Sequence, residues 1–247
     1  MCTLPVFARR VADFLFPRVC VVCKQRLQVG EEYICVSCLQ SMPYTRLEGR
    51  RGNVLERLFM SEDYELGRAT ALYYYQAHSS RTQPILSFKY RHRTDVALWL
   101  GRVMARQLAG SGFFEGVDVI VPVPLSSRRL FQRGYNQCEL LAKGISGVTH
   151  IPVNTAAVVR KVDNATQTHL DYLQREANVS GIFELRRFRQ LQGKHVLLVD
   201  DVITTGSTLR QLAKVVAAAG DVTVSVLAVA LSAFHKHRPE IDAEEAT

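Results

Sequence analysis

Two adjacent acids followed by a run of small polar residues stand in the last quarter of the chain. Carboxylates accept hydrogen bonds from hydroxyl groups, whereas hydroxyls and unpaired backbone amides donate to anions. The combination suits a sugar phosphate, with the sugar hydroxyls on the acids and the phosphate on the polar turn. The residues concerned are Asp200 and Asp201, then Thr204, Thr205, Gly206, Ser207 and Thr208.

The flanking sequence predicts where these residues lie. His195 to Val199 is a short apolar run, typical of a central parallel strand, which we expect to end where the acids begin. Apolar residues then recur at helical spacing, which predicts a helix from Ser207 or Thr208 to Gly220. The free amides and the dipole of a helix N-terminus favour an anion, and Gly206 allows close backbone approach.

This segment resembles the phosphoribosyl pyrophosphate signature of the type I phosphoribosyltransferases. A doubly wound domain with a Thr or Ser helix cap and exposed acids would share some of these features, and so would a receiver-like acidic pocket. We favour the sugar-phosphate interpretation because the acids and the Thr-rich run occur together.

A second loop of interest follows another predicted strand, from Asp118 to Val123. It is proline-stiffened, basic and rich in donors, which suits a leaving pyrophosphate; a stiff connection with solvated arginines is the alternative. A helix is expected to open at Arg133-Gly134-Tyr135-Asn136-Gln137. The loop consists of Val123, Pro124, Leu125, Ser126, Ser127, Arg128 and Arg129.

Two further segments are candidates for ligand contact. The long polar connection from Val159 to Phe183 is expected to act as an active-site lid. Lys89, between Phe88 and Tyr90, is either a ligand contact or a lysine laid along the surface. The lid residues singled out are Thr166, Gln167, Arg175 and Asn178.

Four cysteines form two Cys-x-x-Cys pairs separated by eleven residues. Each pair can direct two thiolates at one tetrahedral zinc ion, and so short a region has little core of its own to hold it. Two disulfides or a redox pair are the alternatives; disulfides are rare in the cytosol. Cys2 and Cys138 lie outside the pattern and are expected to be unligated. The predicted zinc ligands are Cys20, Cys23, Cys35 and Cys38.

The composition is that of a globular protein with one core and a small appendage: 247 residues, 47% hydrophobic. The net charge of +8 favours polyanionic ligands, although scattered basic clusters also fit a solvated surface. We find neither a signal peptide nor an apolar stretch that could span a membrane, and expect a cytoplasmic protein. The expected divisions are 1–58, an N-terminal helix and zinc-binding module; 59–235, the main domain; and 236–247, a disordered tail.

Four segments together resemble the bacterial ComF family, which includes the GntX-type proteins: the cysteine pairs, Val121 to Leu125 with Arg133 to Gln137, Thr166 to Val179, and Val199 to Gly206. The resemblance covers about residues 15 to 233. It implies an α/β fold, a type I phosphoribosyltransferase-like parallel sheet flanked by helices, with an N-terminal zinc module and a link to competence and the use of external DNA.

The resemblance also implies roles for individual segments. Asp200 and Asp201 would bind the ribose, Thr204 to Thr208 the 5-phosphate and Val123 to Arg129 the pyrophosphate, while Thr166 to Val179 would be the flexible loop. Ser126-Ser127 departs from the family, whose members often have a histidine after Val-Pro-Leu.

The leading hypothesis is a phosphoribosyltransferase-like protein that binds phosphoribosyl pyrophosphate and Mg²⁺. Asp200 and Asp201 would orient the sugar, and Arg128 and Arg129, with Lys89, would oppose the departing charge. The alternative is a non-enzymatic competence accessory protein that binds single-stranded DNA or a DNA-uptake partner. Its support is the aromatic and basic residues at Tyr73 to Tyr75 and Phe88 to Arg93. No residue indicates the acceptor.

Overall fold

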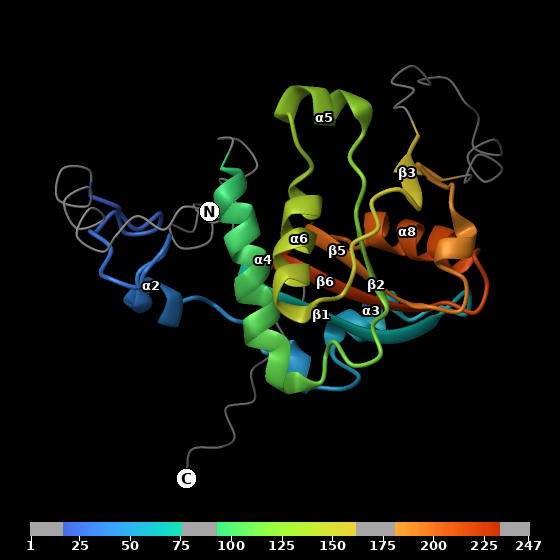
Figure 1. The fold of residues 1–247 in the computed structure, drawn as a ribbon. Coiled ribbons are helices and arrows are strands. Elements are labelled where there is room, and N and C mark those ends of the chain that lie inside the picture. The colour runs from blue at the N-terminus through green and yellow to red at the C-terminus, as the bar shows by residue number, and fades with distance from the viewer. Residues whose placement is uncertain (1–16, 76–92, 162–180, 233–247) are drawn as a thin grey trace, which may run out of the picture.

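The computed structural model describes residues 17–75, 93–161 and 181–232 of the chain (Figure 1). The helix expected within residues 1–16 and the tail expected at 236–247 lie outside these ranges. Among the described residues, no helix is both long enough and apolar enough to cross a membrane.

A four-stranded parallel sheet forms the centre of the molecule. Its strands are β1 (Glu65–Tyr75), β2 (Val119–Pro122), β5 (His195–Ile203) and β6 (Thr223–Ser232), in the order β1-β6-β5-β2. Strands β2 and β5 are neighbours, but after β2 the chain continues to Val153 at the outer edge, whereas after β5 it continues to β6 on the other side. The carboxyl ends of β2 and β5 therefore form a topological switch point, where open α/β sheets bind ligands. The predicted parallel sheet is confirmed.

Helices cover both faces of this sheet. The helices α4 (Thr94–Leu108) and α6 (Gln137–Thr149) pack on one face, and α3 (Val54–Phe59) and α8 (Ser207–Ala217) on the other (Figure 1). Alternate strand residues therefore belong to two separate apolar clusters, as expected for strands buried on both sides. The helices α4 and α6 touch through Gly101 and Gly144: a Cβ on Gly101 would lie 2.2 Å from the carbonyl oxygen of Leu141.

The smaller elements lie at the edges of this three-layer body. An antiparallel hairpin of β3 (Val158–Arg160) and β4 (Phe183–Leu185) stands beyond β2, where Val153 forms a single bridge with Ile120. The remaining elements are α2 (Val36–Gln40), α5 (Ser127–Arg133) and the 3₁₀ turns η1 (Leu47–Gly49), η3 (Ala109–Ser111) and η4 (Phe188–Gln190).

The structure corrects two details of the sequence prediction. Strand β5 does not end at the acids but continues through them to Ile203, because β6 runs alongside and pairs Val202 with Ala230. The segment after Ser126 is not all loop, since residues 127–133 form α5. Ser126 accepts a hydrogen bond from the Arg129 amide as its N-cap, and Gly134 ends the helix at a φ of 73°.

The N-terminal cysteine-bearing segment packs against α4 and β1. The rings of Tyr33 and Trp99 meet edge to face, 5.5 Å between centroids, and Arg102 pairs with Glu32 at 3.3 Å. The division expected between residues 58 and 59 falls within α3, whose Leu55 and Phe59 are part of the apolar cluster on the α8 face of the sheet.

Candidate functional site

The two acids lie near the carboxyl end of β5, beside the end of β2. Asp201 is buried, with 7% of its surface exposed, and Asp200 is half-buried. The backbone amide of Asp201 donates to Oδ1 of Asp200 at 2.8 Å. This bond fixes the carboxylate of Asp200 relative to the strand.

The Thr-rich turn connects these acids to the N-terminus of α8. Gly206 occupies the N-cap position in the left-handed region, at a φ of 72°, and has no side chain with which to cap the helix. A Cβ there would lie 3.1 Å from Cδ2 of Leu58 and 3.3 Å from Cζ of Phe59. Thr204, Thr205 and Ser207 are exposed around it. The turn therefore exposes hydroxyls next to the first-turn amides of α8, an arrangement that can bind an anion.

The second predicted loop runs directly alongside β5. The amide of Val123 donates to the carbonyl oxygen of Val199 at 2.9 Å, and Val123 itself is buried. The side chains of Arg128 and Arg129 lie on α5, where both are exposed. The structure therefore brings the loop next to the acids, while its two arginines belong to the helix that follows it.

Residues at the start of α6 join the two parts of the site, and sequence reasoning assigned them no role there. The side-chain nitrogen Nε2 of Gln137 donates to Oδ2 of Asp201 at 2.9 Å. Sγ of Cys138 lies 3.4 Å from Oδ1 of Asp200. Cys138, expected to be an unligated thiol, contacts one of the acids. The helical spacing of Cys138, Leu141 and Ala142 could have shown that Cys138 faces the core, but no sequence signal indicates its contact with Asp200.

A cavity of about 560 Å³ opens between the second loop and the β3–β4 hairpin. Arg160 stacks over the Phe183 ring at 5.7 Å, and its buried Nε has no partner among the described residues. Arg186 pairs with Glu184 at 3.6 Å. The cavity reaches the second loop but not the acids, and it is lined by Pro122, Pro124, Leu125, Ser127, Leu130, Asn136, Glu139, Thr155, Val158, Val159, Arg160, Lys161, Glu184 and Arg186.

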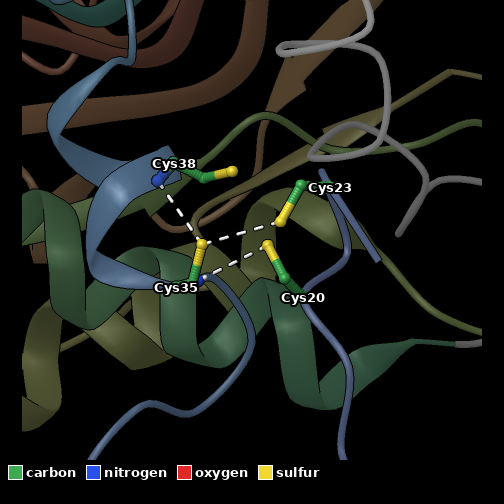
Figure 2. A group of neighbouring side chains, drawn as sticks. All are labelled: Cys20, Cys23, Cys35 and Cys38. Carbon is green, nitrogen blue, oxygen red and sulfur yellow. Dashed lines mark hydrogen bonds between the residues drawn. The ribbon is translucent and has the colours of Figure 1, made fainter. Parts of the chain in front are cut away.

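The four cysteines of the two pairs converge in one cluster (Figure 2). Their sulfur atoms lie within 4.8 Å of one another, and Sγ of Cys23 is 3.7 Å from Sγ of Cys35. Around a tetrahedral zinc with Zn–S bonds of about 2.3 Å, two sulfurs lie about 3.8 Å apart. No disulfide joins the five cysteines within the described part of the chain. The arrangement therefore fits a structural metal ion.

The thiols of this cluster differ in acidity. Burial acts to raise the pKa of Cys20, but hydrogen bonds from the backbone amides of Cys35, Cys23 and Val22 outweigh it and lower the pKa to about 7. Burial, together with the neighbouring thiols, raises the pKa of Cys38 to about 12. Since a metal takes up thiolates, binding would release protons mainly from the less acidic members.

Several predicted site residues lie outside the described residues. They are Lys89 and the four lid residues Thr166, Gln167, Arg175 and Asn178.

Comparison with known proteins identifies the family to which the chain belongs. Residues 99–243 match the family model described as the phosphoribosyl transferase domain, so the chain belongs to that family. The chain is 28% identical over 232 residues to the DNA utilization protein YhgH of Escherichia coli K12, covering 85% of this chain and 95% of the relative. It is 27% identical over 229 residues to competence protein F of Haemophilus influenzae, covering 85% and 96%.

These relatives confirm the resemblance to the ComF family. Among solved structures, a glutamine phosphoribosylpyrophosphate amidotransferase from Bacillus subtilis is similar at 22% identity and a TM-score of 0.42. That likeness covers 57% of this chain and 30% of the other. It is too distant to say anything about the ligand of this site.

Proposed function

We propose that this protein binds phosphoribosyl pyrophosphate together with Mg²⁺, in a cytoplasmic process linked to competence and the use of DNA. The observation that carries the proposal is the junction of β5 and α8. There, two fixed carboxylates stand directly before a glycine-capped helix N-terminus that offers hydroxyls and amides. Acceptors for ribose hydroxyls and donors for a phosphate are thus adjacent, at the switch point of a parallel sheet.

The ligand would span the two loops. Asp200 and Asp201 would accept the ribose hydroxyls, and the turn from Thr204 to Thr208 would donate to the 5-phosphate. The loop from Val123 to Leu125 would face the pyrophosphate, with Arg128 and Arg129 on α5 opposing its charge. The cavity beside this loop is lined by three basic residues and two acids, Arg160, Lys161, Arg186, Glu139 and Glu184, so its lining carries only a small positive excess.

The acids fit a hard divalent cation through their oxygen atoms, whereas the thiol of Cys138 beside them does not. We therefore place Mg²⁺ with Asp200, Asp201 and the ligand's own oxygens. When bound, the ion neutralises part of the pyrophosphate charge.

The proposed chemistry is transfer of the phosphoribosyl group. The bond between the anomeric carbon and the pyrophosphate oxygen breaks with its electron pair leaving on pyrophosphate, and a nucleophile forms the new bond to that carbon. The carboxylates of Asp200 and Asp201 orient the sugar and stabilise positive charge that develops on it, while Arg128 and Arg129 face the departing anion. Catalysis by these residues is therefore positional and electrostatic.

Calorimetry with phosphoribosyl pyrophosphate and Mg²⁺ tests this proposal. The wild-type protein should bind, and Asp200→Asn/Asp201→Asn should weaken binding at least tenfold, because neutral amides interact less strongly with ribose hydroxyls than carboxylates do. Asp221→Asn is the control: it changes the charge of an exposed residue next to the opposite end of β6, at a left-handed position that asparagine accepts. Absence of binding by the wild type, or equal binding by the double variant, would overturn the proposal.

We also propose that the four cysteines hold one structural zinc ion. Elemental analysis should give about one zinc per chain, and Cys35→Ser should lose it because the serine hydroxyl does not replace a thiolate. Ser37→Ala, an equally small change at an exposed position in α2, the helix that Cys35 caps, should retain it. Zinc retained at full stoichiometry in Cys35→Ser would contradict this site.

A second candidate function is binding of single-stranded DNA, and α5 favours it. This helix has Arg128, Arg129 and Arg133 beside Phe131, which is 91% exposed. Exposed aromatic rings stack on bases while arginines contact phosphates. Tyr73, proposed from the sequence for this role, is 1% exposed and cannot stack on a base. Oligonucleotide binding that falls steeply with salt, survives the double Asp change and weakens in Phe131→Ala would establish it.

A further inference from the structure

The first residues of α6 contact both halves of the proposed site. We propose that Asn136 and Gln137 are positioning residues that fix the pyrophosphate-side loop and the ribose-binding acids relative to each other. The inference rests on the proposed function and goes beyond it, because neither residue belongs to a predicted ligand-binding segment.

Asn136 joins the helix to the loop. It is the N-cap of α6, where its Oδ1 accepts from the amide of Cys138 at 3.0 Å. Its Nδ2 donates to the carbonyl oxygen of Val123 at 3.1 Å. A serine or aspartate could cap the helix equally well, but neither supplies this second bond. The asparagine amide therefore does more than capping requires.

Gln137 joins the same helix to an acid. Its Nε2 lies 2.9 Å from Oδ2 of Asp201, and the two side chains are 5% and 7% exposed. A carboxylate only accepts hydrogen bonds, so the amide must present its nitrogen to Asp201. A charge-assisted bond at this burial holds one rotamer of the acid.

The other end of the Gln137 amide supports a positioning role. Its buried Oε1 has no hydrogen-bond partner among the residues that the structure describes. An unsatisfied buried acceptor is costly, and a methionine would fill similar space without that cost. The glutamine is thus explained by its bond to Asp201 rather than by packing.

The two bonds come from consecutive residues at the start of one helix, so they tie Val123 to Asp201 in addition to the backbone bond from Val123 to Val199. Each residue holds a different half of the site. Asn136 should therefore matter for the pyrophosphate half of the ligand and Gln137 for the ribose half. A purely structural role, in which either change loosens α6, would affect both halves together.

Binding of three probes separates these cases: inorganic pyrophosphate, ribose 5-phosphate and phosphoribosyl pyrophosphate, each with Mg²⁺. Asn136→Ser keeps the cap and removes the donor to Val123; it should weaken pyrophosphate binding about tenfold and leave ribose 5-phosphate unchanged. Gln137→Met should weaken ribose 5-phosphate about tenfold and leave pyrophosphate unchanged. Both should weaken phosphoribosyl pyrophosphate.

Asn154→Ser is the matched control. Like Oδ1 of Asn136, Oδ1 of Asn154 accepts from backbone amides, those of Ala156 and Ala157, and its Nδ2 donates to the exposed Gln190 side chain. It should bind all three probes as the wild type does. Thermal unfolding checks that each variant folds, and Gln137→Asn, whose amide is one methylene too short to reach Asp201, replaces Gln137→Met if that variant does not.

The outcomes separate the two proposals. Wild-type protein that binds none of the probes overturns the proposed function and this inference with it. If the wild-type protein binds the probes but each variant either binds them equally well or loses pyrophosphate and ribose 5-phosphate to the same extent, the positioning role alone is overturned.

Discussion

At the scale of single residues, the site depends on conformations that few side chains allow. Gly206 combines a left-handed backbone with a tight approach to Leu58 and Phe59 of α3. Its sequence context, after Thr204-Thr205 and before a predicted helix, was enough to predict a close-approach turn. The contact with α3 was not predictable, because it depends on how a helix about 150 residues earlier in the chain packs.

We expect Gly206→Ala to lower the free energy of unfolding by about 1–2 kcal/mol, the cost of a left-handed conformation for a residue with a Cβ. It should also weaken binding of ribose 5-phosphate, since relief of the contact with Leu58 would displace the turn. Gly193→Ala separates the loss of stability from the loss of binding. Gly193 has a φ of 64°, so alanine there has the same backbone strain, but its Cβ would have no atom within 4 Å. Denaturant unfolding and calorimetry measure them; equal ligand binding by Gly206→Ala and wild type would refute the predicted turn displacement.

At the scale of elements, apolar runs predicted β2 and β5, the two strands next to the site, and helical spacing predicted α8. The runs at Val119 and His195 are strands because apolar residues in sequence suit burial on both faces of a sheet. The continuation of β5 through Asp200 and Asp201 could not be predicted from composition, because it is imposed by pairing with β6. The contact of Gln137 with Asp201 joins residues 64 apart in sequence, and no local pattern encodes it.

The opposite end of β5 contains a pH-sensitive contact. Nε2 of His195 lies 2.8 Å from Oγ of Ser225 in β6, and its backbone amide donates to Asp118. Burial lowers the pKa of His195 from its usual 6.5, against the opposing charges of Asp118 and Glu65. The unfolded chain therefore protonates His195 more readily than the folded chain does. Neutral His195 makes its full contribution to the free energy of unfolding above pH 6.5, and that contribution is lost as the pH falls below this value.

We expect the urea midpoint to fall between pH 7.5 and pH 5.5, and His195→Gln to reduce that fall because glutamine does not titrate. Both proteins should be compared at equal ionic strength. An identical pH dependence in the two would show that other groups, not His195, govern stability in this window.

At the scale of the whole molecule, the cysteine-bearing module and the sheet share one apolar cluster. Cys20, Cys35 and Ile34 of the module belong to the same buried set as Trp99 and Leu100 of α4 and the α6 face of the sheet. The sequence indicated a small appendage, because the chain becomes polar and basic between Gly49 and Asp63, near the division expected after residue 58. The shared packing depends on side chains such as Tyr33 that carry no sequence signal for their partner.

Because of this shared cluster, we expect loss of zinc to change the environment of α4 and the stability of the sheet as well as the cysteine-bearing segment. Trp99 is the only tryptophan of the chain, is 7% exposed and contacts the Tyr33 ring. Removing the metal with a chelator should loosen the module, shift the Trp99 emission to longer wavelength as water reaches the ring, and lower the temperature of a single cooperative unfolding transition. Cys35→Ser should show the shifted spectrum without chelator, and Ser37→Ala should behave as wild type. An unchanged spectrum with two separate transitions would mean that the module and the sheet fold independently, despite the packing between Tyr33 and Trp99.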